Sequence, residues 1–244
     1  MIDIRRAEIS DINAIASLLA AAYIEDEQDA YMFPRRWRYS RRYLATKASI
    51  IRHAFADATS CVEVAVTRSG EDEKIAGVCI WYKDFEEAGI DDPEKVKSKR
   101  SVLHNLEGIC SKIRNSNTVQ FIADLCDPMC SAMNAYRMAR TCADPLSKSY
   151  VEDYKADESD TYGIMDIAVH PEYQHQGIAQ ALISRGFEKA TKEGLAVELC
   201  ATPAGSVVYK KLGFRPVGPW RWSPEMMESG RGWEMLRWEP KSRD

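Results

Sequence analysis

The sequence predicts one α/β domain that is built on a mixed sheet and carries a long helical insertion. Segments rich in Val, Ile and aromatic residues alternate with segments whose apolar residues recur every three or four positions. These segments follow the order β-α-α-β-β-(insertion)-β-α-β-α-β-β, which is typical of α/β sheets. No internal repeat or low-complexity tract interrupts the chain, so we expect a single domain over residues 1–244 with an insertion at about 83–160.

The composition and charge of the chain exclude several classes of protein. Apolar residues make up 45% of the chain and charged residues 29%, which are ordinary values for a globular protein. The formal net charge of −4 argues against nucleic-acid binding, because phosphate contacts need a basic surface. No apolar run approaches the ~18 residues of a membrane span, and the first residues lack the apolar stretch of a signal peptide. We therefore expect a cytoplasmic protein that binds neither nucleic acid nor membranes.

The seven cysteines predict neither disulfides nor a metal site. Their number is odd and there is no export signal, so a disulfide framework is not expected. The chain has no C-x-x-C pair, and its four histidines do not cluster with the cysteines at the spacing of a zinc finger. We expect the thiols to be reduced and to behave as small buried apolar groups.

The N-terminal third predicts a strand, two helices and a hairpin. The side-chain oxygen of Ser10 is expected to cap the first helix. A polar loop at 68–72 separates two segments that are rich in β-branched residues, as in a hairpin. The expected elements are a strand at Ile2–Ala7, helices at about 12–23 and 41–55, and strands at Cys61–Thr67 and Lys74–Tyr82.

The C-terminal third contains a strand that leads through a glycine turn into an amphipathic helix. The first backbone N–H groups of a helix lack internal partners, and the helix dipole adds positive charge there. A pyrophosphate satisfies both, provided that small residues such as Gly177 and Ala179 let it approach. The expected elements are strands at Thr161–Val169 and Leu195–Ala201, helices at about 177–192 and Ser206–Leu212, and closing strands from Gly213 to near Trp238.

Two motifs in this third resemble those of the GNAT superfamily of N-acetyltransferases. Gln174-x-x-Gly177-x-Ala179 matches the family signature Q/R-x-x-G-x-G/A, and Tyr209-Lys210-Lys211-Leu212-Gly213-Phe214 is similar to its closing Y-x-x-x-G-F element. The helix and strand that the family requires lie between them. The resemblance implies a GNAT-like fold, with a mixed, mainly antiparallel twisted sheet flanked by helices and the helical insertion between strands 3 and 4. It also implies acetyl-CoA as the co-substrate.

The resemblance assigns cofactor contacts to particular residues. Backbone groups of Ile167 and Val169 would pair with the pantetheine arm as with an added strand. Backbone amides of His175–Gln180 would hold the pyrophosphate, and Thr202 stands where many relatives carry Asn. The cofactor-binding residues implied in this way are Ile167, Ala168, Val169, Gln174, His175, Gln176, Gly177, Ile178, Ala179, Gln180 and Thr202.

The resemblance also implies direct attack of a neutral amine on the thioester. Tyr209 would protonate the leaving thiolate, since its reference pKa of ~10 suits a thiolate whose conjugate pKa is ~8.5. Some relatives place a basic Glu or His where this chain has Gly163 and Met165. Asp166 is the carboxylate of this strand, but alternation turns it to the face opposite Met165 and Ile167. A catalytic Asp166, a structural Asp166, a water chain and a carboxylate from the insertion all stay open as explanations.

An aromatic and basic segment separates the first two predicted helices. In GNAT-like folds this region usually borders the acceptor site. Its aromatic residues are therefore expected either to line a substrate pocket or to belong to the core. They are Tyr31, Phe33, Trp37, Tyr39 and Tyr43, interleaved with Arg35, Arg36, Arg38, Arg41 and Arg42.

The leading hypothesis is transfer of an acetyl group from acetyl-CoA to a primary amine of a small molecule. The alternatives are acetylation of a protein N-terminus or lysine, and an acyl-CoA-binding module that has lost catalysis. The insertion has helical periodicity and ends in an acidic run at 152–160 that would favour a cationic amine. It is expected to cover the acceptor side of the cleft, or to form a homodimer interface through its apolar stretch Val119–Ala135.

Overall fold

The protein folds around one seven-stranded sheet. The computed structural model describes residues 2–69, 72–82, 129, 161–220 and 233–240. Within these residues the strand order is β1-β2-β3-β4-β5-β7-β6. Every neighbouring pair is antiparallel except β4 and β5, which are parallel. The predicted mixed, mainly antiparallel sheet flanked by helices is confirmed. The expected insertion at about 83–160, with its acidic run, lies outside the described residues apart from Met129.

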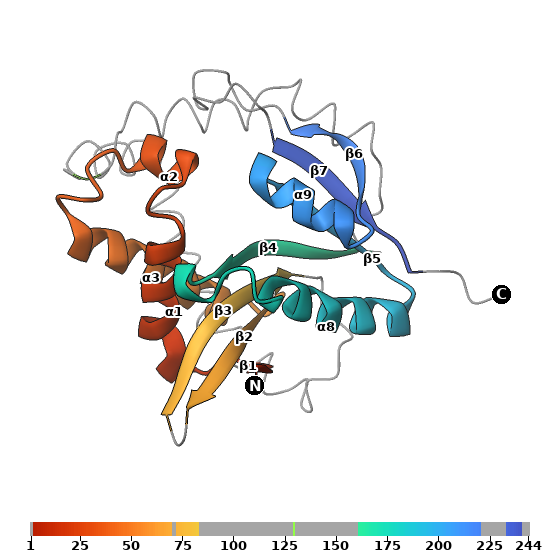
Figure 1. The fold of residues 1–244 in the computed structure, drawn as a ribbon, viewed down its shortest axis with the longest axis horizontal. Coiled ribbons are helices and arrows are strands. Elements are labelled where there is room, and N and C mark those ends of the chain that lie inside the picture. Colours follow the sequence, from red (N-terminus) through yellow and green to blue (C-terminus); the bar gives the residue numbers. More distant parts are fainter. Residues whose placement is uncertain (1, 70–71, 83–128, 130–160, 221–232, 241–244) are drawn as a thin grey trace.

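The order of the elements agrees with the prediction, with one short helix added before α3 (Figure 1). The strands are β1 (Ile2–Arg6), β2 (Ser60–Ser69), β3 (Asp72–Tyr82), β4 (Thr161–Val169), β5 (Ala196–Ala201), β6 (Arg215–Trp220) and β7 (Trp233–Trp238). The helices are α1 (Ile12–Ala22), α2 (Glu27–Met32), α3 (Ser40–Ala56), α8 (Ile178–Glu193) and α9 (Pro203–Lys211), with 3₁₀ turns η1 (Ile9–Asp11) and η3 (Pro171–Tyr173). Among these helices none is long and apolar enough to cross a membrane.

Helices cover both faces of the sheet, and the alternation of β3 shows how. Val78 and Ile80 belong to a core cluster that contains residues of α1 and α3. Their neighbours Cys79 and Trp81 point to the other face and join a cluster with residues of α8. Successive strand residues point to opposite faces of the sheet, so the apolar residues of β3 pack against helices on both faces.

The cap of α1 and the start of α9 differ from the prediction, whereas α1 begins at Ile12 as expected. Ser10 does not cap α1, because its hydroxyl donates to the Glu8 carboxylate over 3.4 Å. The turn η1 precedes α1 instead, and the Glu8 N–H donates to the Asp11 carboxylate over 2.8 Å. The helix α9 begins at Pro203 instead of near Ser206, because Thr202 caps it and proline is favoured at the first helical position.

A buried carboxylate fixes α8 against the sheet. Glu63 of β2 accepts hydrogen bonds from the Trp81 indole (3.1 Å), from Arg185 (2.9 Å) and from Lys189 (2.8 Å), the last two lying on α8. A Cβ atom at Gly186 would lie 2.0 Å from the Trp81 ring, so only glycine permits this approach of helix and strand. These contacts hold the middle of α8 against β2 and β3.

Candidate active site

The site begins where β4 and β5 stop pairing. The two parallel strands are paired from Thr161 with Ala196 to Ile164 with Leu199. Beyond that point β4 continues to Val169, and within the described residues no strand pairs with this edge. On its other edge β4 stays paired with β3 up to Val169. The sheet is therefore forked, with one edge of β4 open on the side that faces β5.

A β-bulge lies at the base of the fork. On β3, Ile80 pairs with Asp166 and the next residue Trp81 pairs with Ile164, so Met165 is the extra residue of β4. Met165 is 52% exposed and lines the same cleft as Asp166. The strict alternation expected for this strand is therefore wrong at this point, because a bulge places an additional residue in one strand and bends it. Asp166 still faces away from Ile167, as expected.

The open edge of β4 presents backbone groups of the residues predicted to hold a pantetheine arm. The N–H of His170 donates to Ala76 of β3, so alternation turns the N–H and C=O groups of Ile167 and Val169 to the open edge. Both carbonyl groups accept a side-chain hydrogen bond at 3.3 Å, Ile167 from the Tyr23 hydroxyl and Val169 from the Gln174 amide.

The N-terminus of α8 lies next to this edge. Gly177 is its N-cap with φ of 79°, and glycine has no side chain to cap the amides of Ile178, Ala179 and Gln180. His175 is exposed and has φ of 60°, an uncommon conformation for a residue other than glycine. Strained backbone of this kind persists where the surrounding structure or a function requires it. The turn from Gln174 to Gly177 therefore presents backbone groups to a ligand, as an anion cradle does.

The helix α9 contributes side chains to the opposite wall of the cleft. The Thr202 hydroxyl accepts a hydrogen bond from the Gly205 N–H over 3.1 Å and so caps the helix. The Tyr209 ring makes an edge-to-face contact with the Phe214 ring, and the two ring centroids lie 5.7 Å apart. Burial raises the pKa of Tyr209, and the nearby Cys79 and Asp166 raise it further. The Tyr209 hydroxyl consequently keeps its proton at neutral pH and can donate it.

These elements enclose a cleft of about 740 Å³. Residues of β4, β5 and α9 line one part of it, and the end of α1, the start of α2 and residues of α3 line the other. That second wall carries the carboxylates Glu25, Asp26 and Asp29 and one ammonium group, Lys47. Carboxylates outnumber the cation among these lining residues, so the cleft favours a positively charged ligand.

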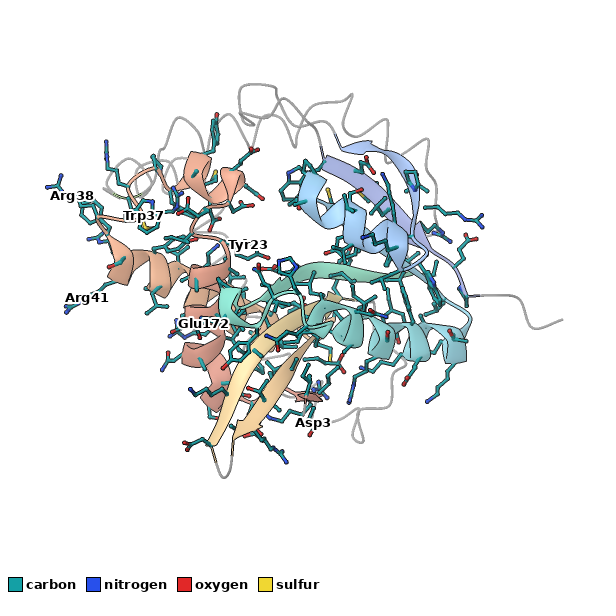
Figure 2. The ribbon with its side chains drawn as sticks, viewed as in Figure 1. Asp3, Tyr23, Trp37, Arg38, Arg41 and Glu172 are labelled. Carbon is teal, nitrogen blue, oxygen red and sulfur yellow. The ribbon has the colours of Figure 1, made fainter. Side chains whose placement is uncertain are left out.

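One hydroxyl–carboxylate pair spans the cleft. The Tyr23 hydroxyl, at the C-terminal end of α1, donates to Oδ1 of Asp166. Burial raises the pKa of Asp166, while the hydrogen bond from Tyr23 and the positive charge of Lys47 act in the opposite direction. Figure 2 shows Tyr23 on the side of the helical layer that faces the body of the sheet. Sequence analysis did not identify Tyr23 as a site residue.

A second pair of the same kind lies in the helical layer, where Tyr43, which does not line the cleft, contacts a residue of the cleft wall. The Tyr43 hydroxyl donates to Oδ2 of Asp29, which also forms an ion pair with the buried Lys47. The Lys47 ammonium lies 4.7 Å from the centroid of the Tyr23 ring and 5.2 Å from that of Tyr43. Lys47 thus lies between the two pairs and satisfies the charge of Asp29.

The structure separates the two interpretations of the aromatic and basic segment. None of its five aromatic residues lines the cleft, and Tyr43 is buried in the helical layer. Trp37 is 61% exposed, and Figure 2 shows it with Arg38 and Arg41 at the outer tip of that layer. The helical wall of the cleft comes instead from residues between Tyr23 and Asp29, just before the segment. Sequence analysis did not single out this stretch; the neighbouring carboxylates Glu25 and Asp26 are the signal that could have pointed to it.

The glycine at position 163, where the resemblance implied a base in some relatives, has a packing explanation. Gly163 pairs with Tyr82 of β3, and a Cβ atom at this position would lie 1.9 Å from the Tyr82 ring. The ring therefore covers the glycine backbone, and a larger residue would displace it. Gly163 itself offers no side chain that could accept a proton, whereas the carboxylate Asp166 lines the cleft.

Comparisons with known proteins agree with this geometry. Residues 149–216 match the family model described as acetyltransferase (GNAT) domain. A histone acetyltransferase HPA2 and related acetyltransferase from Corynebacterium glutamicum has a similar structure, with a TM-score of 0.57, 16% identity and coverage of 100% of this chain and 98% of that chain. A mosquito arylalkylamine N-acetyltransferase like 5b is also similar, with a TM-score of 0.51, 14% identity and coverage of 98% and 100%. No curated protein sequence matches the chain. At these identities the structural likeness establishes the fold.

Proposed function

We propose that this chain, in which residues 149–216 match the acetyltransferase (GNAT) domain model, transfers an acetyl group from acetyl-CoA to a primary amine of a small molecule. The observation that carries this proposal is the fork in the sheet, where the open edge of β4 meets the uncapped N-terminus of α8. An extended arm ending in a pyrophosphate needs a strand edge and a group of free amides in this order along its length.

The cofactor contacts in this proposal are mostly backbone groups. The N–H groups of Ile167 and Val169, with Ala168 between them, would pair with the amides of the pantetheine arm. The pyrophosphate would lie on the amides of the α8 turn, which are those of His175, Gln176, Gly177, Ile178, Ala179 and Gln180, beside Gln174. Thr202 already accepts a hydrogen bond through its oxygen, so its own proton is the group that it offers to the cofactor.

Side chains would perform the proton transfers. When bound, acetyl-CoA supplies the thioester carbon that the amine attacks. Tyr209 keeps its proton because burial raises its pKa, and it would give this proton to the leaving thiolate. Asp166 would accept a proton from the incoming ammonium group. The acidic wall of Glu25 and Asp26 would attract that cation to the cleft.

The test is acceptor-dependent release of free thiol from acetyl-CoA by the purified full-length protein. The panel contains small primary amines, the matching N-methylated tertiary amines as controls, a lysine peptide and a peptide with a free N-terminus. Faster release with a small cationic amine than with either peptide supports the proposal. Preference for a peptide overturns the acceptor class. Binding of acetyl-CoA by calorimetry without thiol release from any amine identifies a binding module and overturns the enzymatic proposal.

A further inference from the structure

Tyr23 is the residue outside the family motifs that makes the most direct contact with the reacting region. It ends α1, and its hydroxyl reaches β4 across a sequence separation of 143 residues. The hydroxyl contacts Oδ1 of Asp166 and lies 3.3 Å from the carbonyl oxygen of Ile167. All three residues line the cleft at the base of the fork. The aromatic side chain therefore joins the helical layer to the bulge of β4.

The Tyr23 hydroxyl has one proton for two acceptors. A hydrogen bond to a carboxylate is stronger than one to a neutral carbonyl group, so Asp166 is the favoured acceptor. In the proposed complex the Ile167 carbonyl faces the added arm and can accept from it instead. Ligand binding would then leave the Tyr23 proton to Asp166 alone. The hydrogen bond from Tyr23 is directed to Oδ1, and the carboxylate also interacts with the Ile167 backbone. In this proposal Oδ2 is the atom that would accept a proton from an acceptor amine.

Several ionisable groups face this pair from the surrounding elements. Lys47 of α3 lies over the Tyr23 ring, and Tyr209 approaches from α9. The charges of Asp26 and Asp29 also act on the pair from the start of α2, and Cys79 lies beneath it on β3. Burial favours the protonated form of Asp166, while Lys47 and the Tyr23 hydroxyl favour the ionised form. The Tyr23 hydrogen bond thus opposes the effect of burial on the carboxylate.

We propose that Tyr23 is a positioning residue that orients Asp166 and keeps it ionised as the proton acceptor for the amine, an inference that rests on the proposed acetyl transfer. Asp166 Oδ2 removes one proton from the ammonium group of the acceptor. The freed nitrogen lone pair forms the C–N bond to the acyl carbon, the C–S bond breaks, and Tyr209 protonates the thiolate. The second proton leaves the nitrogen to restore the Tyr209 hydroxyl, and Asp166 releases the first to solvent.

The test compares Tyr23→Phe with Tyr43→Phe. Each variant removes one hydroxyl that donates to an aspartate and lies beside Lys47, but only Tyr23 contacts β4. The activity of the wild type should rise with pH through the pKa of Asp166, because the ionised form is the active one. In Tyr23→Phe that acid limb of kcat/KM should move to higher pH by about one unit, since burial is no longer opposed by the hydrogen bond. Tyr43→Phe should keep the wild-type pH profile, and calorimetry should show unchanged acetyl-CoA binding in both.

A titration of the Asp166 carboxyl by carbon-13 NMR tests the same bond without any turnover. The pKa of Asp166 should be higher in Tyr23→Phe than in the wild type, and unchanged in Tyr43→Phe. The double variant Tyr23→Phe/Asp166→Asn should be no slower than Asp166→Asn alone, because Tyr23 acts through the carboxylate. An unmoved acid limb, an unmoved carboxyl titration or additive losses in the double variant would each overturn the role of Tyr23. Absence of thiol release by the wild type would instead overturn the acetyl transfer on which it rests.

Discussion

The two helices that follow the parallel strands begin in opposite ways. After β4, the helix α8 starts at Gly177, whose φ of 79° only glycine adopts easily, and no side chain of this N-cap bonds the first amides. After β5, the helix α9 starts at Thr202, whose hydroxyl accepts a hydrogen bond from Gly205. Thr202 lines the cleft, and Gln174, just before the α8 turn, lines it as well, whereas residues 175–180 do not. The first amides of α8 receive no hydrogen bond from their N-cap side chain and can bind a ligand, whereas α9 is capped by its own Thr202 hydroxyl.

This difference indicates that α8 acts through backbone amides and α9 through side-chain hydroxyls. The α8 turn can bind an anion through backbone amides, which almost every residue type carries. A substitution there therefore affects binding only by changing the size or charge of the side chain or the backbone angle φ. The helix α9 contributes through specific atoms, the Thr202 and Tyr209 hydroxyls. A substitution that removes one side-chain oxygen should therefore have an effect at Thr202 or Tyr209 of α9 and none in the α8 turn, whereas added bulk or charge should have its main effect in the α8 turn.

Removal of the Tyr209 hydroxyl is expected to have the largest effect. Tyr209→Phe keeps the ring and its contact with Phe214 but removes the proton donor, so turnover should fall by ~10²-fold or more with little change in cofactor affinity. Rapid-quench measurement of a single turnover reports this step. Tyr162→Phe is the matched control, because it loses a 2.6 Å hydrogen bond to Glu193 away from the cleft. Equal single-turnover rates in the Tyr209 variant and the wild type would show that Tyr209 is only a packing residue.

Charge at the α8 turn should act on affinity instead of turnover. Gly177→Glu places a carboxylate and a Cβ where the pyrophosphate is proposed to lie, and acetyl-CoA should bind more than tenfold more weakly, or by at least ~1.4 kcal/mol. Gly194→Glu is its control at the other end of the same helix. Both glycines have positive φ, and an added Cβ would meet nothing within 4 Å at either position. Both variants lose ~1–2 kcal/mol of stability because a residue other than glycine is strained at positive φ. A difference between them in acetyl-CoA affinity, measured by calorimetry, would therefore come from a ligand bound at Gly177.

The motifs of the α8 turn and the closing element were readable from the sequence because their chemistry is local. The turn requires a glycine with positive φ only a few residues after the preceding strand. This short spacing between strand and glycine is visible in the sequence. The order of the elements along the chain followed from periodicity for the same reason, including the hairpin of β2 and β3. The forked edge was not predicted, since parallel pairing that stops at Ile164 leaves no trace in the residue pattern.

The rest of the site depended on contacts that no local pattern encodes. The bulge at Met165 changes the register between β3 and β4, so alternation alone gave the wrong relation between Met165 and Asp166. Tyr23 reaches Asp166 from a distant part of the chain, and its sequence neighbours indicate only the end of a helix. The acidic wall was visible as Glu25-Asp26-Glu27, but the nearby aromatic residues were weighed as pocket lining in its place.

The smallest of the expected effects concerns Thr202, where one hydroxyl is proposed to serve both the helix and the cofactor. Thr202→Val keeps the shape of the side chain and removes the cap, which should lower the free energy of unfolding by about 1 kcal/mol. The same change removes the proton offered to the cofactor, so acetyl-CoA affinity should fall a few-fold, as expected for one neutral hydrogen bond. Chemical denaturation and calorimetry measure the two effects separately.

Thr202→Asn distinguishes the two roles because asparagine can do both. Its side-chain oxygen is a good N-cap, and its amide group can donate to the cofactor, so stability and affinity should both stay near the wild-type values. Loss of stability in Thr202→Val with full acetyl-CoA affinity would show that the hydroxyl only caps α9. The two helix starts would then differ completely, with α8 alone binding the cofactor at its N-terminus and α9 acting through Tyr209. Loss of affinity with full stability would mean that the hydrogen bond from Gly205 to Thr202 contributes nothing to the free energy of unfolding. The proposed difference between an uncapped α8 and a capped α9 would then be wrong.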